Sequence, residues 1–328
     1  MKKPTIKEDE TASKERSTES TKEWNNQTLR KIHRKMVEMY NIDFTYFRDI
    51  KIIKQSEILK QLTERMRNNL KENGVIYSDV QWKQIHESLS KNPATGFFEN
   101  LAFYNPEDDV LYMNEKMIKN HPEKIIPICT HELSEKLLST YLPSHLKTPT
   151  HVLVKAYVEA EKTNNPRKLH ELLNMSVDIV FKSVFKEGIC EAITFQTLRH
   201  ADPEMKVASL EKELEIGHSK CIDVLFDLEK AKRNTDAIEK NQTMLHRKRR
   251  KIQVTDGEKP IEETLGSFQI IKGISYYLGY PLAKAVLEKY GINGIKLALE
   301  KHPPNKAQYF AEPQTYLAWL EKLIAFKE

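Results

Sequence analysis

Apolar residues recur at steps of three and four along most of this chain, and this spacing is the feature that most limits how it can fold. One stripe starts near Trp24 and continues through Leu29, Ile32, Met36 and Met39. A second runs through Ile58, Leu62, Met66 and Leu70. Side chains spaced in this way share one face of an α-helix. Only 10 glycines and 14 prolines occur among the 328 residues, which is too few for the turns of an all-β sandwich or barrel. The sequence therefore predicts a predominantly α, globular protein.

Two segments have the pattern of strands and predict a small β-sheet, which makes the expected class α+β. D-I-K-I-I-K at residues 49–54 has the composition of a short strand. Residues 97–104 and 110–113 are rich in aromatic and aliphatic side chains and are separated by the turn N-P-E-D-D, which predicts a β-hairpin. Between these segments, Ser78 and Gln81 match a capping box and predict a further helix.

The balance of charge gives little reason to expect a polyanionic partner. The 52 basic and 47 acidic residues leave a formal net charge of +5, which is small beside the total. The basic run H-R-K-R-R-K at 246–251 is a candidate for phosphate contacts. No aromatic residues interleave with it for stacking on bases, so a solvated basic loop is the favoured interpretation. We do not expect nucleic acid to be the partner.

The cysteine count indicates a protein of a reducing compartment, and the hydropathy indicates that no segment spans a membrane. Cys129, Cys190 and Cys221 are too few, and odd in number, for a disulfide framework. No apolar run reaches the ~20 residues that cross a bilayer. The N-terminus M-K-K-P-T-I-K-E-D-E lacks the apolar stretch of a signal peptide. We therefore expect a cytoplasmic protein.

The segment T-H-E-L-S-E is the strongest indication of chemistry. In H-E-x-x-H, two histidines on one helical face bind zinc and the glutamate activates water. His-Glu occurs three times in this chain, at His86, His131 and His170. Only the second is followed four residues later by a strong metal ligand, which is Glu135. Residues 126–138 are apolar nearly all round, so this polar pair needs a compensating partner once buried. A metal would supply it, and the alternative is a bond to a neighbouring lysine, arginine or backbone group.

A later segment, E-G-I-C-E-A at residues 187–192, offers a third ligand. T-H-E-L-S-E-K-L-L followed by K-E-G-I-C-E-A-I-T resembles the gluzincin class of zinc metallopeptidases, in which H-E-x-x-H precedes an E-G-x-A-like motif on a later helix. The resemblance implies that His131 and Glu187 bind the metal, that Glu135 stands where the second histidine would be, and that Glu132 is the general base. It also implies a zincin-like domain whose hairpin lies over the active-site helix and aligns a peptide or protein substrate. The C-terminal Y-Y-L-G-Y-P-L-A-K is similar to the tail of some uncharacterised prokaryotic members.

A glutamate in place of the second histidine changes the chemistry expected of the metal. Two carboxylate ligands, Glu135 and Glu187, cancel the charge of a divalent ion. In the usual site the pKa of the metal-bound water falls to ~7, and a neutralised ion is expected to lower that pKa less. Zn²⁺ is the expected cofactor, and oxygen-rich ligands shift the preference somewhat towards Mn²⁺ or Fe²⁺. Without a metal the two carboxylates repel, and one is expected to stay protonated.

Three residues beside these motifs are weaker candidates. Glu191 lies one turn beyond Glu187 and is a candidate for orienting His131, although a solvated or lysine-paired glutamate is an equally good interpretation. Cys129 and Cys190 flank the proposed site and suggest thiolate ligands. A small buried apolar residue is the favoured interpretation of both cysteines.

Two further pairs fit the chemistry by residue type alone. His145 and His151 follow the first motif, but nearby prolines indicate a surface loop, so neither is expected to replace the missing ligand. Oxyanion stabilisation needs a donor such as tyrosine. Tyr276 and Tyr277 lie in the C-terminal region of the resemblance, and core packing is the favoured interpretation of both.

The pattern divides the chain into four parts. Residues 1–22 contain almost no apolar side chains and are expected to form a disordered charged tail. Residues 23–202 would form the zincin-like core with both metal-site helices. Residues 203–258 would be a long helical insertion with the basic loop, and residues 259–328 the C-terminal helical part of the same domain. The insertion keeps apolar or small residues at helical spacing, weakened at Gly217 and Ala231, so a helical hairpin or an arm packed on the main domain is favoured over a free coiled coil.

Two functions follow from these observations. The first is a zincin-like metallohydrolase of the peptidase type, with Glu132 as general base. The alternative is a catalytically inactive zincin-like protein that binds a peptide or a protein partner in the same cleft. A two-metal carboxylate site ranks behind both, because the chain lacks the Glu-x-x-His pairs that such sites use.

Overall fold

A computed structural model describes most of the chain after the first 25 residues. The described residues are 26–72, 78–80, 82–83, 102–142, 166–202, 205, 207–230, 232–233 and 258–325. The predicted tail at 1–22 and the basic run at 246–251 lie outside these ranges, as do His145 and His151.

The described chain is mostly helical, which confirms the predominantly α prediction. Its helices are residues 26–40, α2 (Gln55–Glu72), α4 (Glu115–Asn120), α5 (Ile125–Tyr141), α7 (Pro166–Ala201), α8 (Val207–Cys221), a helical segment at 223–230, α10 (Glu258–Lys301), α11 (Ala307–Ala311) and α12 (Pro313–Ala325). A short 3₁₀ helix, η2 (Pro122–Lys124), precedes α5. The axis of α10 breaks at Gly291, whose φ of 63° lies in the left-handed region that glycine adopts without strain.

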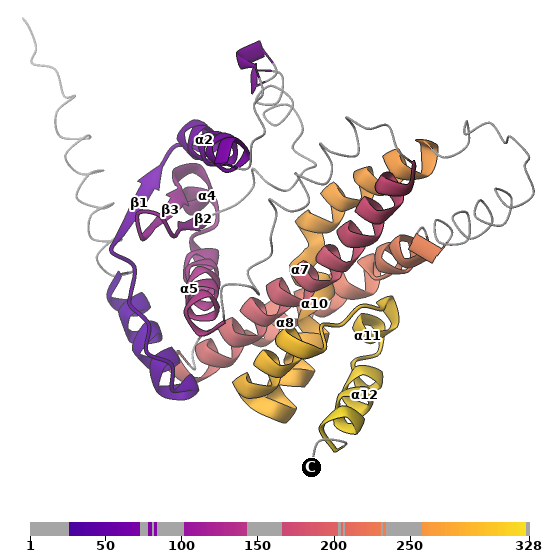
Figure 1. Cartoon of the computed structure of the whole chain (residues 1–328). Helices are drawn as coiled ribbons and strands as arrows, with labels where there is room; N and C mark the ends of the chain where they lie inside the picture. Colours follow the sequence, from indigo (N-terminus) through magenta and orange to yellow (C-terminus); the bar gives the residue numbers. More distant parts are fainter. Residues whose placement is uncertain are drawn as a thin grey trace, which may run out of the picture.

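A three-stranded sheet stands on one side of α5 (Figure 1). Its strands are β1 (Asp49–Ile53), β2 (Ala102–Asn105) and β3 (Val110–Asn114), in the order β1-β3-β2. β1 runs parallel to β3, and β2 pairs with β3 as the antiparallel hairpin that the sequence predicts. β2 is thus an edge strand, and it packs against α5.

A buried lysine fastens this hairpin to α5. Lys136 Nζ forms an ion pair with Asp109, in the hairpin turn, and donates a hydrogen bond to the Tyr46 carbonyl at 3.0 Å. The ammonium group also lies 5.3 Å from the centre of the Tyr104 ring. A buried cation needs such partners, because desolvation without them is costly. The contacts hold β2 against one face of the helix that carries the His-Glu motif.

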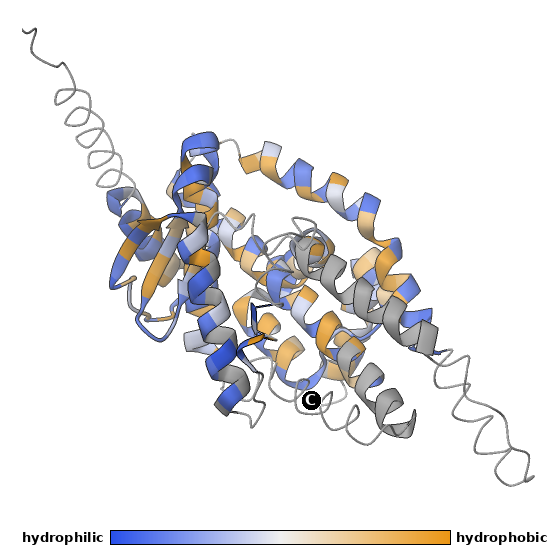
Figure 2. Ribbon diagram, turned by 90° about the horizontal axis from the view of Figure 1, so that it is seen from above, coloured by the Kyte–Doolittle hydropathy of each residue, from blue (hydrophilic) through white to orange (hydrophobic). Residues whose placement is uncertain are grey.

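One cluster of buried apolar side chains runs from the first helix to α12. Apolar and polar positions alternate around the helices, as the orange and blue bands of Figure 2 show. The largest fully buried side chains include Phe181 and Phe185 of α7, Tyr280 of α10, and Phe310 and Tyr316. The sheet and the helices therefore share one core.

α7 and α10 cross at a pair of glycines. A methyl group built on Gly188 would stand 2.1 Å from the carbonyl carbon of Gly279, and one built on Gly279 would stand 1.9 Å from the carbonyl oxygen of Val184. Only glycine permits such an approach between two helical backbones. Gly188 is the glycine of the E-G-I-C-E-A segment, so this crossing sets the position of the residues around it.

The arm predicted from residue 207 onward packs along α10. Val207 and Leu214 of α8 are buried, as are Leu225 and Leu228 beyond it. Gly217, which was expected to weaken the stripe, instead makes room for a ring, because a methyl group there would stand 2.3 Å from the Tyr277 side chain.

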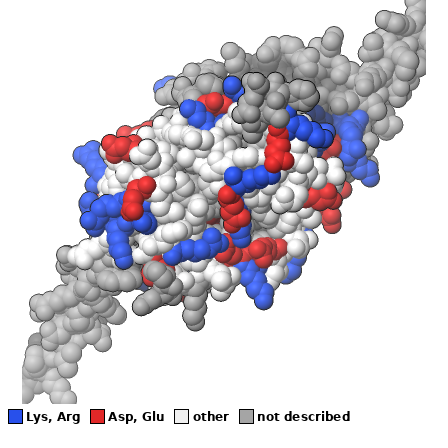
Figure 3. Space-filling view, turned by 90° about the horizontal axis from the view of Figure 1, so that it is seen from below, with Lys and Arg blue, Asp and Glu red and all other residues white. Residues whose placement is uncertain are grey.

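Charges of both signs are interspersed on the face of the molecule shown in Figure 3. Within the described ranges, no helix combines the length and the apolar character required to span a bilayer.

Candidate metal centre

α5 carries polar residues on two of its faces. Pro127 lies in its first turn, where a missing N–H has no intrahelical partner to lose, so the helix starts at Ile125 without interruption. The Ser134 hydroxyl contacts that of Thr194 at 3.0 Å, which links α5 to α7. His131 and Glu135 also face α7, whereas Glu132 faces β2.

The imidazole of His131 lies between two carboxylates of α7. Nδ1 donates to Glu191 Oε1 at 2.9 Å, and Nε2 is 3.4 Å from Glu187 Oε2. Burial alone lowers the pKa of His131, but the charge of Glu191 and hydrogen bonds to Glu187 and Glu191 outweigh it and raise the pKa well above the usual value. The contact predicted between Glu191 and His131 is present.

Glu135 has a cationic neighbour that the sequence did not identify. Lys186 Nζ lies 3.6 Å from Glu135 Oε1, across the gap between α7 and α5. Burial lowers the pKa of Lys186, but the charges of Glu135 and Glu187 outweigh it and raise that pKa above its usual value. Glu135 therefore has a lysine partner, as the alternative interpretation of this helix face anticipated.

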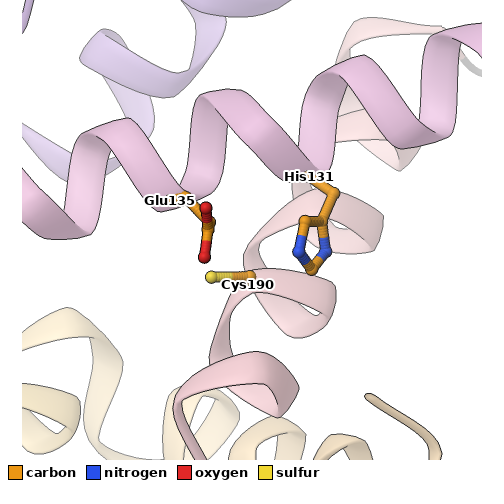
Figure 4. Close-up of side chains that lie close together, drawn as sticks. All are labelled: His131, Glu135 and Cys190. Atoms are coloured by element: carbon orange, nitrogen blue, oxygen red, sulfur yellow. The ribbon is translucent and has the colours of Figure 1, made fainter. Parts of the chain in front are cut away.

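Cys190 joins these residues from α7. The ligand atoms of His131, Glu135 and Cys190 all lie within 4.8 Å of one another, and Figure 4 shows the sulfur of Cys190 next to the Glu135 carboxylate, with the His131 ring on the other side of the cysteine. Glu187 is close to His131 but is not part of this group. Burial raises the pKa of the Cys190 thiol well above its usual value. We therefore count Cys190 among the candidate ligands, which the sequence pattern alone did not favour.

Glu132, the predicted general base, accepts a hydrogen bond from an edge strand. The Tyr104 N–H donates to Glu132 Oε2 at 2.7 Å. Burial, followed by the charge of Glu135, raises the pKa of Glu132 to about 8, while His131 and the Tyr104 N–H act in the opposite direction. Because Glu132 responds to the charges of both His131 and Glu135, it lies beside the cluster although it faces the sheet.

Tyr276 of α10 also comes near the centre. Burial, a hydrogen bond with Tyr277 and the charge of Glu191 raise the pKa of Tyr276. The two tyrosine rings are 4.1 Å apart between centroids. The sequence could not place either ring relative to His131, because their approach depends on the crossing of α7 and α10.

These pKa shifts predict how the stability of the metal-free protein depends on pH. Glu132 has a pKa of about 8 when folded and 4.5 as its ordinary value, so the folded state holds a proton that the unfolded state releases. The contribution of this protonated carboxyl group to the stability of the folded state is fully present below about pH 4.5 and is lost as the pH rises towards 8. The raised pKa of His131 acts in the same direction above its ordinary value of 6.5.

We therefore expect the unfolding free energy of chelator-treated protein to fall by a few kcal/mol between about pH 5 and 8. Denaturant titrations at several pH values measure it. The Glu132→Gln variant should show a flatter profile, since its amide does not titrate. An equal slope in both proteins would contradict the assignment.

No protein-family model, no curated protein and no solved structure matches this chain. The case for a function therefore depends on the geometry described above and on the sequence resemblance.

Proposed function

We propose that this protein is a zincin-like metallohydrolase of the peptidase type. His131, Glu135 and Glu187 would hold a divalent cation, and Glu132 would act as general base. The observation that carries the proposal is that His131 lies between two carboxylates of α7. Its Nδ1 donates to Glu191 at 2.9 Å, which leaves Nε2 directed at a second acidic residue. Metal-binding histidines are commonly oriented in this way by a carboxylate on the other ring nitrogen.

The donor set suits such an ion. Two ligands about 2.0–2.1 Å from a tetrahedral Zn²⁺ are ~3.3 Å apart, and His131 Nε2 lies 3.4 Å from Glu187 Oε2. Three carboxylates, on Glu135, Glu187 and Glu191, meet one lysine and one imidazole in a partly buried space. A cation would reduce the repulsion among them. Zn²⁺ fits the imidazole, and Mn²⁺ or Fe²⁺ are alternatives for the carboxylates.

The neighbouring residues suit hydrolysis of a peptide bond. A cation held here supplies a Lewis acid that acidifies water and stabilises negative charge on oxygen. Glu132 would take the proton from the attacking water and pass it to the leaving amine. Its hydrogen bond to Tyr104 fixes this carboxyl group beside β2. An edge strand can pair with an extended peptide, which would bring a substrate backbone next to Glu132.

One observation favours the alternative of a protein that binds a peptide or partner without catalysis. Lys186 pairs with Glu135, and His131 pairs with Glu191, so part of the charge is already balanced within the protein. Such pairs can persist without any cation. This alternative holds with or without a structural metal, so metal content and hydrolytic activity together separate the two proposals.

Elemental analysis of protein purified without chelator is the first experiment. We expect about one equivalent of metal per chain, lost in His131→Ala and in Glu187→Ala. His121→Ala is the matched control, because this histidine is half-buried at the start of η2 and does not belong to the cluster. Metal that survives both site substitutions would refute the ligand assignment. A wild-type protein that binds none, even after incubation with Zn²⁺, would leave the non-catalytic alternative.

A further inference from the structure

We propose that the sulfur of Cys190 is a ligand of the same cation, so that the centre is a mixed imidazole, carboxylate and thiolate site selective for thiophilic ions such as Zn²⁺. This inference deepens the proposed function and rests on it. Neither the His-Glu motif nor the resemblance assigns a role to this cysteine.

The position of Cys190 carries the argument. It lies on α7 at i+3 from Glu187 and i−1 from Glu191, so the three residues project from one side of the helix. Its sulfur is within 4.8 Å of ligand atoms of both His131 and Glu135 (Figure 4). Ligand atoms around a tetrahedral Zn²⁺ with one thiolate are ~3.3–3.6 Å apart. Side-chain movements of up to ~1.5 Å would bring the donors of His131, Glu135 and Cys190 to such separations.

The second buried cysteine near the motif behaves differently. Both cysteines belong to the buried core, but Cys129 Sγ contacts the sulfur of Met113 in β3 at 3.7 Å. Both cysteines have no exposed surface. Only Cys190 combines burial with a place among imidazole and carboxylate groups. For Cys129 the interpretation as a small apolar residue therefore fits, whereas for Cys190 it leaves the polar surroundings unexplained.

A thiolate ligand has two consequences for the centre. It shifts the preference from Mn²⁺ and Fe²⁺ towards zinc, because sulfur favours softer ions. Together with His131, Glu135 and Glu187 it also completes four protein donors, so water can enter only if the shell expands or one carboxylate withdraws. Glu135 is the carboxylate that we expect to withdraw, because it can pair with Lys186, whose Nζ lies 3.6 Å from Glu135 Oε1.

Cobalt substitution tests the inference without an activity assay. Full-length protein loaded with Co²⁺ should show a near-ultraviolet thiolate-to-cobalt charge-transfer band in addition to the visible bands of the bound ion. Cys190→Ser should lose the charge-transfer band and bind Zn²⁺ at least ~10–100-fold more weakly, since the loss of a ligand should exceed the loss of an outer partner. Cys129→Ser is the matched control and should keep the band.

A second measurement needs no variant. X-ray absorption of the zinc-loaded wild-type protein should show one sulfur neighbour at ~2.3 Å. Stoichiometric cobalt without a thiolate band, a zinc shell without sulfur, or a band that survives in Cys190→Ser would overturn the inference and leave the proposed metal site standing. Failure to bind either metal would instead reject the proposed function itself.

Discussion

Replacement of Glu132 by glutamine is expected to lower peptide hydrolysis by about 10²–10⁴-fold while the metal content stays unchanged. Glutamine keeps an oxygen that accepts the hydrogen bond from the Tyr104 N–H, so the contact between α5 and β2 should survive. It cannot take a proton from water, which is the role proposed for Glu132. The measurement compares initial rates on a mixture of unstructured fluorogenic peptides with metal content on the same samples.

Glu123→Gln is the matched control, because it makes the same chemical change on an exposed residue of η2 just before α5. It should leave both the rate and the metal content unaltered. A Glu132→Gln protein that hydrolyses these peptides as fast as the wild type would reject the general-base assignment. Loss of metal in that variant would show instead that Glu132 takes part in binding.

The second large effect is expected from Gly279→Ala. The added methyl group would lie 1.9 Å from the Val184 carbonyl oxygen and 2.9 Å from the Gly188 amide nitrogen. These are backbone atoms of a helix and cannot rotate away, so α7 and α10 must separate. We expect a loss of about 3 kcal/mol or more in the free energy of unfolding, at the upper end of what overpacking costs. Denaturant titration measures this loss.

The same substitution should also weaken metal binding, because Gly188 lies between Glu187 and the cysteine and glutamate that follow it on α7. Glu288→Ala on α10 is the control. Its side chain is exposed, so the substitution should change the free energy of unfolding by less than about 0.5 kcal/mol. An unaltered midpoint for Gly279→Ala would mean that the helices do not cross as closely as described.

Local patterns predicted the elements well. Helical spacing identified the first helix, α2, α5 and α7, and the alternation around N-P-E-D-D identified the hairpin. The carboxylate of Glu191 was proposed to orient His131, and the two groups are 2.9 Å apart. The helices and the hairpin depend on residues close together in the chain, whereas the contact of Glu191 with His131 joins two helices and was suggested by the position of Glu191 one turn beyond Glu187.

The contacts that the sequence did not reveal all depend on how separate helices meet. The ion pair of Lys186 with Glu135 and the approach of Cys190 require the rotation of α7 relative to α5. The proximity of Tyr276 to Glu191 requires the close crossing of α7 and α10. Periodicity gives the face of each helix but not the angle at which two helices cross. Gly188 was noticed as part of a motif, and only the packed structure identifies Gly279 as its partner.

The placement of chemistry on two faces of α5 has a consequence for how this protein can tolerate sequence change. Glu132 belongs to the face against the sheet, whereas His131 belongs to the face against α7. Adjacent positions of a helix are held ~100° apart by the helix itself. The angle between these two side chains is therefore set by α5 alone and does not depend on the sheet or on α7. We expect the loops around the sheet to accept insertions, deletions and substitutions without a change in that angle. The turns of α7 that face α5 should accept far fewer changes, because they supply the partners of His131.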